Sequence, residues 1–278
     1  MIFASSTSRA LSAAFALLVL IASCKKEAKK TASSDAQNKE TVAAASASVT
    51  AYAVLNTALD IMFVTGAPES ESERATADRK YGCATVTATP GGFVDFPKEV
   101  VVDFGTGCTL RGYTGKGSVS FTLNQWIAIP GTEIVPVFND FYVNGYKIEG
   151  DYKITTVSAT AFKIDIIDGI VTFPNGTVFH LKGTQNYTQT AGSSTPLVFG
   201  DDVYSITGDI ASTSSLGDIE GTITSPLIKE IACNNITSGK IDLKTNNATA
   251  TLDYGDGTCD NTGTLIIGPL SFPVTLPF

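Results

Sequence analysis

The cysteines are the residues of this 278-residue chain whose types and spacing most directly indicate chemistry. Cys24 follows Ile21-Ala22-Ser23. Small residues before a cysteine, at the end of an apolar segment, are typical of a bacterial lipobox, in which the cysteine becomes N-terminal and acylated. The other four are Cys83, Cys108, Cys233 and Cys259. An even number in an exported chain predicts disulfides.

Four cysteines can pair in three ways. The spacing favours Cys83 with Cys108 and Cys233 with Cys259, because about 25 residues separate the members of each pair. Each second cysteine also ends a similar glycine turn, in 103–108 and 253–259. Each bridge would stabilise the fold by about 3 to 4 kcal/mol. A zinc site would need cysteines two residues apart or several histidines, and the sequence has neither.

Asp253, Asp256 and Asp260 form a calcium candidate, since oxygen-rich glycine loops suit Ca²⁺. However, their spacing is not that of an EF-hand, and the first copy has Thr106 where the second has Asp256. Turn-forming aspartates explain the same residues without a metal. We expect no other cofactor.

The sequence indicates no catalytic residue. The single histidine, His180, lies between Phe179 and Leu181, which predicts a side chain on a sheet face. The serine-hydrolase, zinc-protease and phosphate-loop motifs do not occur. The paired carboxylates of a glycosidase leave no sequence motif, so a carboxylate-dependent carbohydrate-active or other hydrolytic enzyme stays the alternative to a non-enzymatic protein.

Four aromatic residues could line a sugar- or peptide-binding surface: Trp126, Tyr142, Tyr146 and Tyr152. The alternative is that they pack in the core or across strands. A glycan or protein ligand is therefore an expectation without an assigned site.

Residues 1–23 are predicted to be a lipoprotein signal peptide. Arg9 is the only charge before the apolar run 10–21, which is too short to cross a bilayer permanently. An ordinary secretory signal cleaved near Ser23 is the alternative. Acylated Cys24 would hold the protein on a lipid bilayer, and we expect the periplasmic or surface face of the outer membrane.

Residues 24–47 are predicted to form a disordered tether, because they contain almost no large apolar side chains. Their five lysines could favour anionic headgroups, or the segment could be a soluble spacer. Without residues 1–23 the chain carries 18 Lys and Arg against 27 Asp and Glu, a net charge of −9. Such a body repels phosphate backbones, which makes nucleic acid an unsuitable partner.

Residues 48–80 are predicted to contain a helix and a connector. From Ala43 to Val64 the apolar side chains recur at steps of three and four, and Gly66 and Pro68 end the pattern. The apolar stripe must pack on something, either a face of the sheet that follows or a partner protein. Residues 69–80 form the connector.

From Tyr81 the apolar period changes to two, and short runs rich in β-branched and aromatic residues predict strands. These runs are 84–88, 100–104, 118–123, 141–148, 162–167, 177–181, 203–210, 219–223, 240–243, 248–254, 264–267 and 272–276. Asn144-Gly145, Asp168-Gly169 and Pro174-Asn175-Gly176 are hairpin turn signals.

Residues 81–278 are therefore predicted to be one all-β domain, an antiparallel meander that forms a sandwich or a partly closed barrel. The chain ends in Phe278, as strands of outer-membrane barrels often do. The predicted strands are nevertheless shorter than the nine to eleven residues that span a bilayer, and Pro273 and Pro277 interrupt the last one, which argues against a transmembrane barrel.

Several segments together resemble a group of Bacteroidetes hypothetical lipoproteins. They are the lipobox with Lys25-Lys26, residues 83–87, residues 102–108, the 141–145 hairpin and residues 252–261. The resemblance covers the exported body and implies a membrane-tethered β protein of unassigned role. It therefore supplies no catalytic residue.

The sequence predicts a lipid-anchored, disulfide-bonded, all-β protein of the bacterial envelope, with a non-enzymatic structural or ligand-binding module. It does not predict an oligomeric state.

Overall fold

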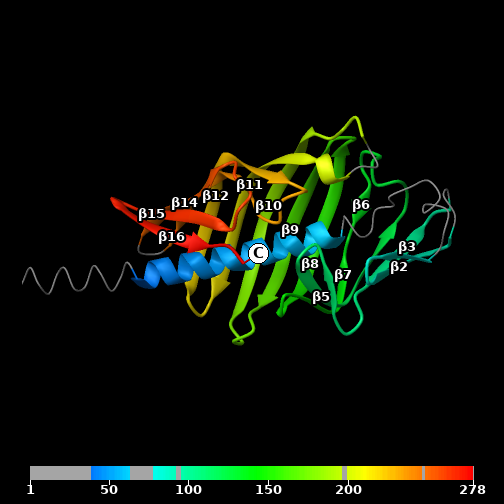
Figure 1. Ribbon diagram of the computed structural model, residues 1–278, viewed down its shortest axis with the longest axis horizontal. Coiled ribbons are helices and arrows are strands. Elements are labelled where there is room, and N and C mark those ends of the chain that lie inside the picture. Colours follow the sequence, from blue (N-terminus) through cyan, green and yellow to red (C-terminus); the bar gives the residue numbers. More distant parts are fainter. Residues whose placement is uncertain (1–38, 63–77, 92–94, 196–198, 246–247, 278) are drawn as a thin grey trace, which may run out of the picture. The chain divides into compact units, whose positions relative to one another are not determined.

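The computed structural model describes residues 39–62, 78–91, 95–195, 199–245 and 248–277. The predicted signal peptide and Cys24 lie outside these residues. A helix, Lys39–Met62, is followed by antiparallel strands that join into one sheet (Figure 1). The predicted all-β meander with a single N-terminal helix is confirmed.

The strands pair in nearly sequential order. They are β1 (Asp78–Tyr81), β2 (Ala84–Thr89), β3 (Lys98–Asp103), β4 (Cys108–Leu110), β5 (Tyr113–Leu123), β6 (Glu133–Ile134), β7 (Val137–Val143), β8 (Tyr146–Ser158), β9 (Ala161–Thr172), β10 (Val178–Ala191), β11 (Val203–Ser214), β12 (Gly217–Glu230), β13 (Ser238–Lys244), β14 (Thr249–Asp256), β15 (Thr262–Ile267) and β16 (Leu270–Thr275), with a 3-10 helix, η1 (Phe199–Asp201), before β11. Only β4, which pairs with β5, and β6, which pairs with β8, leave the path. The path ends at β1 and β16, so strand pairing does not close a barrel.

Each long strand buries one face. On β10, Phe179, Leu181, Gln185 and Tyr187 are buried, whereas the residues between Phe179 and Leu181 and between Gln185 and Tyr187 are exposed. This alternation follows from the two-residue period of a strand. The sheet therefore has an inner face, which carries the core, and an outer face in contact with solvent.

The helix occupies the inner face of the sheet. From Ala51 to Met62 it is buried almost all around, as expected for a helix enclosed by other elements. The helix is long and apolar enough to cross a membrane, but 61% of its most apolar stretch is buried inside the protein. The prediction that it packs on the sheet is confirmed. Residues 39–47, assigned above to the tether, are also helical, because alanine and threonine there find burial that the tether prediction did not foresee.

Two of the three turn predictions are confirmed. Asn144 and Gly145 form a turn with φ of 48° and 84°, and Pro174-Asn175-Gly176 closes the β9–β10 hairpin. The Asp168-Gly169 prediction is wrong, because both residues lie inside β9 and pair with Asp151 and Gly150. Glycine is needed here for packing, since a Cβ on Gly169 would lie 2.5 Å from the Tyr152 hydroxyl.

Candidate functional site

The two predicted disulfides are confirmed. Cys83 pairs with Cys108 and Cys233 with Cys259, with Cα–Cα distances of 5.6 and 5.7 Å. In each pair one cysteine is buried, Cys108 or Cys233, and the other is exposed. Each disulfide thus joins the core to a surface turn.

The turns before Cys108 and Cys259 share one hydrogen bond. The Gly105 N–H donates to Asp103 Oδ1 at 2.8 Å, and the Gly255 N–H donates to Asp253 Oδ1 at 3.0 Å. Both glycines have positive φ, 60° and 103°, which glycine adopts without a steric penalty. The sequence similarity of the two segments therefore reflects the same local structure. We call residues 83–113 the first disulfide unit and residues 229–259 the second.

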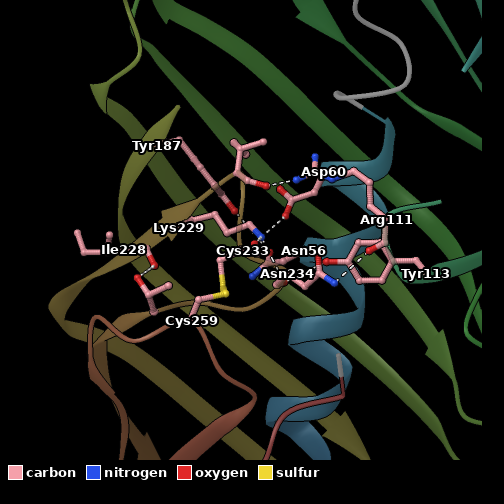
Figure 2. A network of polar contacts seen from close by, with 12 residues as sticks. Asn56, Asp60, Arg111, Tyr113, Tyr187, Ile228, Lys229, Cys233, Asn234 and Cys259 are labelled. Atoms are coloured by element: carbon pink, nitrogen blue, oxygen red, sulfur yellow. Dashed lines mark hydrogen bonds and ion pairs between the residues drawn. A yellow bond between two sulfur atoms is a disulfide. The ribbon is translucent and has the colours of Figure 1, made fainter. Parts of the chain in front are cut away.

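The two units also contact each other directly. Arg111 of the first unit donates to the Ile231 carbonyl, and the Asn234 amide donates back to the Arg111 carbonyl at 3.1 Å (Figure 2). The Tyr113 hydroxyl donates to the Asn234 carbonyl at 3.2 Å. These side chains link β4–β5 with the segment after β12, where strand pairing does not.

A buried ion pair connects the second unit to the helix. The Lys229 ammonium lies 3.0 Å from Asp60 Oδ2, and its side chain is only 7% exposed. It also donates to the carbonyls of Cys233, at 2.6 Å, and Asn234, at 3.2 Å. Lys229 therefore makes two hydrogen bonds to backbone carbonyls in addition to its ion pair with Asp60. These three contacts hold its side chain in place between the helix and the segment after β12.

Asp60 belongs to a polar stripe along one face of the helix. Ser48, Tyr52, Asn56 and Asp60 recur every four residues, a spacing that places side chains on one side of a helix. Ser48 accepts a hydrogen bond from Ser212 on β11 at 2.8 Å, and Asn56 Oδ1 lies 3.5 Å from the hydroxyl of Tyr187 on β10. The stripe therefore attaches the helix to three successive strands, β10, β11 and β12.

Buried tyrosines surround this stripe. Burial raises the pKa of Tyr52 to about 12, and it also raises the pKa values of Tyr187 and Tyr254. The Tyr254 hydroxyl has no hydrogen-bond partner among the described residues. It borders a small hollow, partly open to solvent, which Tyr52, Asn56, Asp60 and Lys229 also line. The tyrosines are neutral at physiological pH, and none is poised to act as a base.

The calcium candidates do not converge. Asp256 Oδ1 accepts from the Thr258 hydroxyl at 2.8 Å, and Asp260 Oδ1 accepts from the Thr262 hydroxyl at 2.8 Å. Asp253 pairs with Lys240 at 2.9 Å. Each aspartate thus serves its own turn or strand pair. Within the part of the chain that the structure describes, no three His, Cys, Asp or Glu side chains gather closely enough to hold a metal ion.

His180 lies on the exposed face of β10, as predicted, with its Nδ1 3.4 Å from Asp168 Oδ1. Both side chains are about half exposed, 50% and 48%. The arrangement is an exposed cross-strand pair on the outer face.

The four aromatic candidates do not form one surface. Tyr152 is fully buried, and its hydroxyl donates to the Glu149 carbonyl at 3.1 Å, so its assignment to a binding surface is wrong. Tyr146 packs edge-on against Phe173, and Trp126 packs against Phe96. Tyr142 lies beneath the ammonium of Lys116, 4.6 Å from the ring centre. Core and cross-strand packing explains these residues.

Asp60 and Lys229 were missed at the sequence level, although the sequence contains a signal for both. Asp60 is flanked by Leu59 and Ile61 in an apolar helix, and Lys229 follows Leu227 by two residues, on the same face of a strand. A charge on a face predicted to be buried requires a partner. Asp60 and Lys229 are two such charges of opposite sign, and they are therefore candidate partners in an ion pair.

The fold and this cluster define an all-β, disulfide-bonded module whose inner face is built around one helix. Comparisons with family models, with curated proteins and with solved structures each return no significant match.

Proposed function

We propose that the chain is a lipoprotein of the bacterial envelope, held on a membrane through acylated Cys24, and that its β body is a non-enzymatic structural or ligand-binding module. The observation that carries the proposal is the use of the cysteines. All four in the described residues pair with one another. The disulfides therefore do not require Cys24, which ends the lipobox sequence Ile21-Ala22-Ser23-Cys24.

The same bridges support the proposed compartment. Disulfides persist in oxidising compartments and are rare in the cytosol, so two of them in one body support export. The resemblance to Bacteroidetes lipoproteins supports the outer membrane as the destination. An apolar run that is too short to span a bilayer, followed by a lipobox, provides both the export signal and the anchor.

The non-enzymatic assignment rests on the state of the charged groups. Lys229, the buried lysine of the helix contact, pairs with Asp60 and donates to the carbonyls of Cys233 and Asn234. Asp253, Asp256 and Asp260 accept hydrogen bonds from backbone N–H groups of their own turns. These charged groups therefore stabilise the fold through their hydrogen bonds and ion pairs. No observation favours the alternative of a carboxylate-dependent hydrolase, which would need two carboxylates facing each other across a groove.

Metabolic labelling with a palmitate analogue tests the anchor. We expect label in the full-length wild-type protein, and none in Cys24→Ala. The matched control is Cys233→Ala/Cys259→Ala, which loses two cysteines of the body and should keep the label. Label retained by Cys24→Ala would refute the anchor. Equal loss in the control would show that labelling depends on folding, and would remove the support for Cys24 as the acylated residue.

A further inference from the structure

Two hairpin turns contain the dipeptide Asn-Gly, whose asparagine side chain can lose ammonia without an enzyme. The pairs are Asn144-Gly145, between β7 and β8, and Asn175-Gly176, between β9 and β10, and all four residues are exposed. In this reaction the glycine amide nitrogen attacks the Cγ atom of the asparagine. Glycine favours the attack, because it has no Cβ that would hinder the approach. The two turns therefore carry the same reactive groups, and the contacts of each asparagine decide whether it reacts.

The Asn144 side chain is bonded to a neighbouring strand. Its Oδ1 accepts from the N–H of Thr114 on β5 at 2.7 Å, and the Asn144 N–H donates to the Thr114 carbonyl at 2.8 Å. Thr114 lies thirty residues earlier in the chain, so the bond ties the side chain to a different part of the sheet. Before Cγ can reach the Gly145 nitrogen, the side-chain bond to Thr114 must open.

The Asn175 side chain, in contrast, is bonded within its own turn. Its Oδ1 accepts from the Thr177 N–H, two residues further on, at 3.0 Å. An Asx-turn of this kind folds the side chain along the backbone that it bridges, which brings Cγ toward the Gly176 nitrogen. A Cβ placed on Gly176 would meet no atom of the described chain within 4 Å. The surroundings therefore leave room for the ring that the attack forms.

One hydrogen bond opposes the reaction at Asn175. The Gly176 N–H donates to the Phe173 carbonyl at 2.9 Å, and the nitrogen must lose its proton before it attacks. Because the turn is exposed, water can replace this bond, and exposed backbone hydrogen bonds open at a low cost in free energy. Hydroxide removes the proton, so the reaction becomes faster as the pH rises.

We propose that Asn175 is a site of spontaneous deamidation in the folded protein, and that Thr114 protects Asn144 from the same reaction. The Gly176 nitrogen forms a bond to Asn175 Cγ, and the bond between Cγ and the side-chain nitrogen breaks. Ammonia leaves, and a cyclic imide remains. One water molecule then opens the imide on either side and gives aspartate or isoaspartate. The net reaction consumes one water, releases one ammonia, and does not depend on the proposed lipid anchor.

The product changes the β9–β10 turn. Either product adds a negative charge, and isoaspartate also lengthens the main chain by one methylene group. The longer chain no longer matches the bond from the Phe173 N–H to the Thr177 carbonyl, which is 2.8 Å long in the intact turn. Phe173 packs edge-on against Tyr146 at the start of β8, with ring centres 5.0 Å apart. Deamidation therefore loosens the ends of two adjacent hairpins.

Peptide mass mapping of the full-length protein, incubated in water enriched in a heavy oxygen isotope, measures the reaction at each asparagine. Each deamidated side chain takes one oxygen from the solvent. In the folded protein we expect Asn175 to react faster than Asn144 by a factor on the order of ten, which corresponds to the net free energy of one or two hydrogen bonds. In urea-unfolded protein the two rates should be alike, which provides the matched control. The rate at Asn175 should rise from pH 6 to pH 8.

A second variant keeps the test specific. Asn175→Gln should abolish deamidation at this position, because the longer side chain would have to form a larger ring, and it should leave the rate at Asn144 unchanged. Equal rates at Asn144 and Asn175 in the folded protein would overturn the proposal, since Thr114 would then give no protection. A reaction at Asn175 that proceeds in urea and stops on folding would also overturn it, because the bond from Gly176 to Phe173 would then close the turn. None of these results alters the palmitate test of Cys24.

Discussion

The two disulfide units have the same covalent frame and turn, but different interiors. An aromatic residue stands between the aspartate and the glycine of each turn, Phe104 in the first unit and Tyr254 in the second, and each is 3% exposed. Phe104 packs against Phe141 with ring centres 5.6 Å apart, in an apolar setting. Tyr254 instead borders the hollow beside the helix that Asn56, Asp60 and Lys229 also line. The disulfide and the turn are therefore repeated in the two units, whereas the surroundings of the aromatic residue differ.

The difference indicates a division of roles. Apolar packing is non-directional and fills the core next to the first unit. Hydrogen bonds and ion pairs depend on geometry, and the second unit uses them to hold Asp60 of the helix. The first unit contributes Arg111 and Tyr113, whose side chains donate hydrogen bonds to backbone carbonyls of the second unit. The second unit therefore orients the helix, and the first braces the second.

Breaking the ion pair should cause a large loss of stability. Lys229→Ala leaves Asp60, whose side chain is 21% exposed, without its cation. Because losing one partner of a fully buried pair costs about 3–5 kcal/mol, we expect about 2–4 kcal/mol of unfolding free energy to be lost here. Lys244→Ala is the matched control, because the Lys244–Glu220 pair is 70% and 74% exposed, and its loss should cost about 0.5 kcal/mol or less. Urea denaturation measures both.

A double variant shows whether the charge itself is required. Asp60→Leu/Lys229→Met replaces the pair with apolar groups of similar size and should recover much of the stability lost in Lys229→Ala. Equal, small losses in Lys229→Ala and Lys244→Ala would contradict the assignment of helix orientation to the second unit.

Removing the disulfides one at a time sharpens the comparison between the units. Cys83→Ala/Cys108→Ala and Cys233→Ala/Cys259→Ala open loops of 25 and 26 residues, and the chain-entropy model gives each about 3–4 kcal/mol. We expect the second variant to lose roughly 1 kcal/mol more, because the Cys233–Cys259 bridge holds in place the segment whose backbone carbonyl at residue 233 accepts from Lys229. Guanidinium denaturation of both variants checks the order. A larger loss from the first variant would reverse the assigned roles.

Much of the fold could be predicted from local patterns. The period of two located most of the longer strands, and the repeated glycine turns gave the disulfide pairing that the structure contains. Strand lengths were underestimated for β8 to β12, which run for 12 to 14 residues. Glycines such as Gly150 and Gly169 interrupt the hydrophobic pattern, yet they continue the strands.

The contacts of the site depend on tertiary structure and escaped local analysis. Arg111 and Ile231 are 120 residues apart, and nothing near either residue in the sequence identifies the other. The helix was predicted, but not the curvature of the sheet that buries it almost all around. Charges such as Asp60, placed within apolar patterns, were the one local sign of this contact.

Two single substitutions, one in each unit, test whether the surroundings of the two aromatic residues differ in their tolerance of a hydroxyl group. Tyr254→Phe removes a buried hydroxyl that has no partner among the described residues, and should be neutral or stabilising by up to about 1 kcal/mol. Phe104→Tyr places a hydroxyl against Phe141 and should cost about 1–3 kcal/mol. Thermal denaturation compares the two. A destabilised Tyr254→Phe would show that its hydroxyl is bonded in solution, within the polar network of the second unit.

The smallest expected effect concerns the pH dependence of the second turn. The Lys240 ammonium, and then the Gly255 N–H, lower the pKa of Asp253 below its ordinary value of 3.8. A carboxyl with a lowered folded-state pKa contributes stability that is present above the unfolded-state pKa and is lost as the pH falls through the folded-state pKa.

Asp253→Asn should therefore be less stable than wild type at pH 7, by about 1 kcal/mol or less for this partly exposed pair. The difference should begin to shrink as the pH falls below the ordinary value and should vanish below the lowered folded-state pKa. Asp103→Asn in the first turn, for which no lysine contact parallel to that of Lys240 is described, serves as the control; denaturation at pH 7 and at pH 3 separates the two. A difference for Asp253→Asn that stays constant over this range would mean that Lys240 does not act on the carboxylate, and that the two turns are electrostatically equivalent.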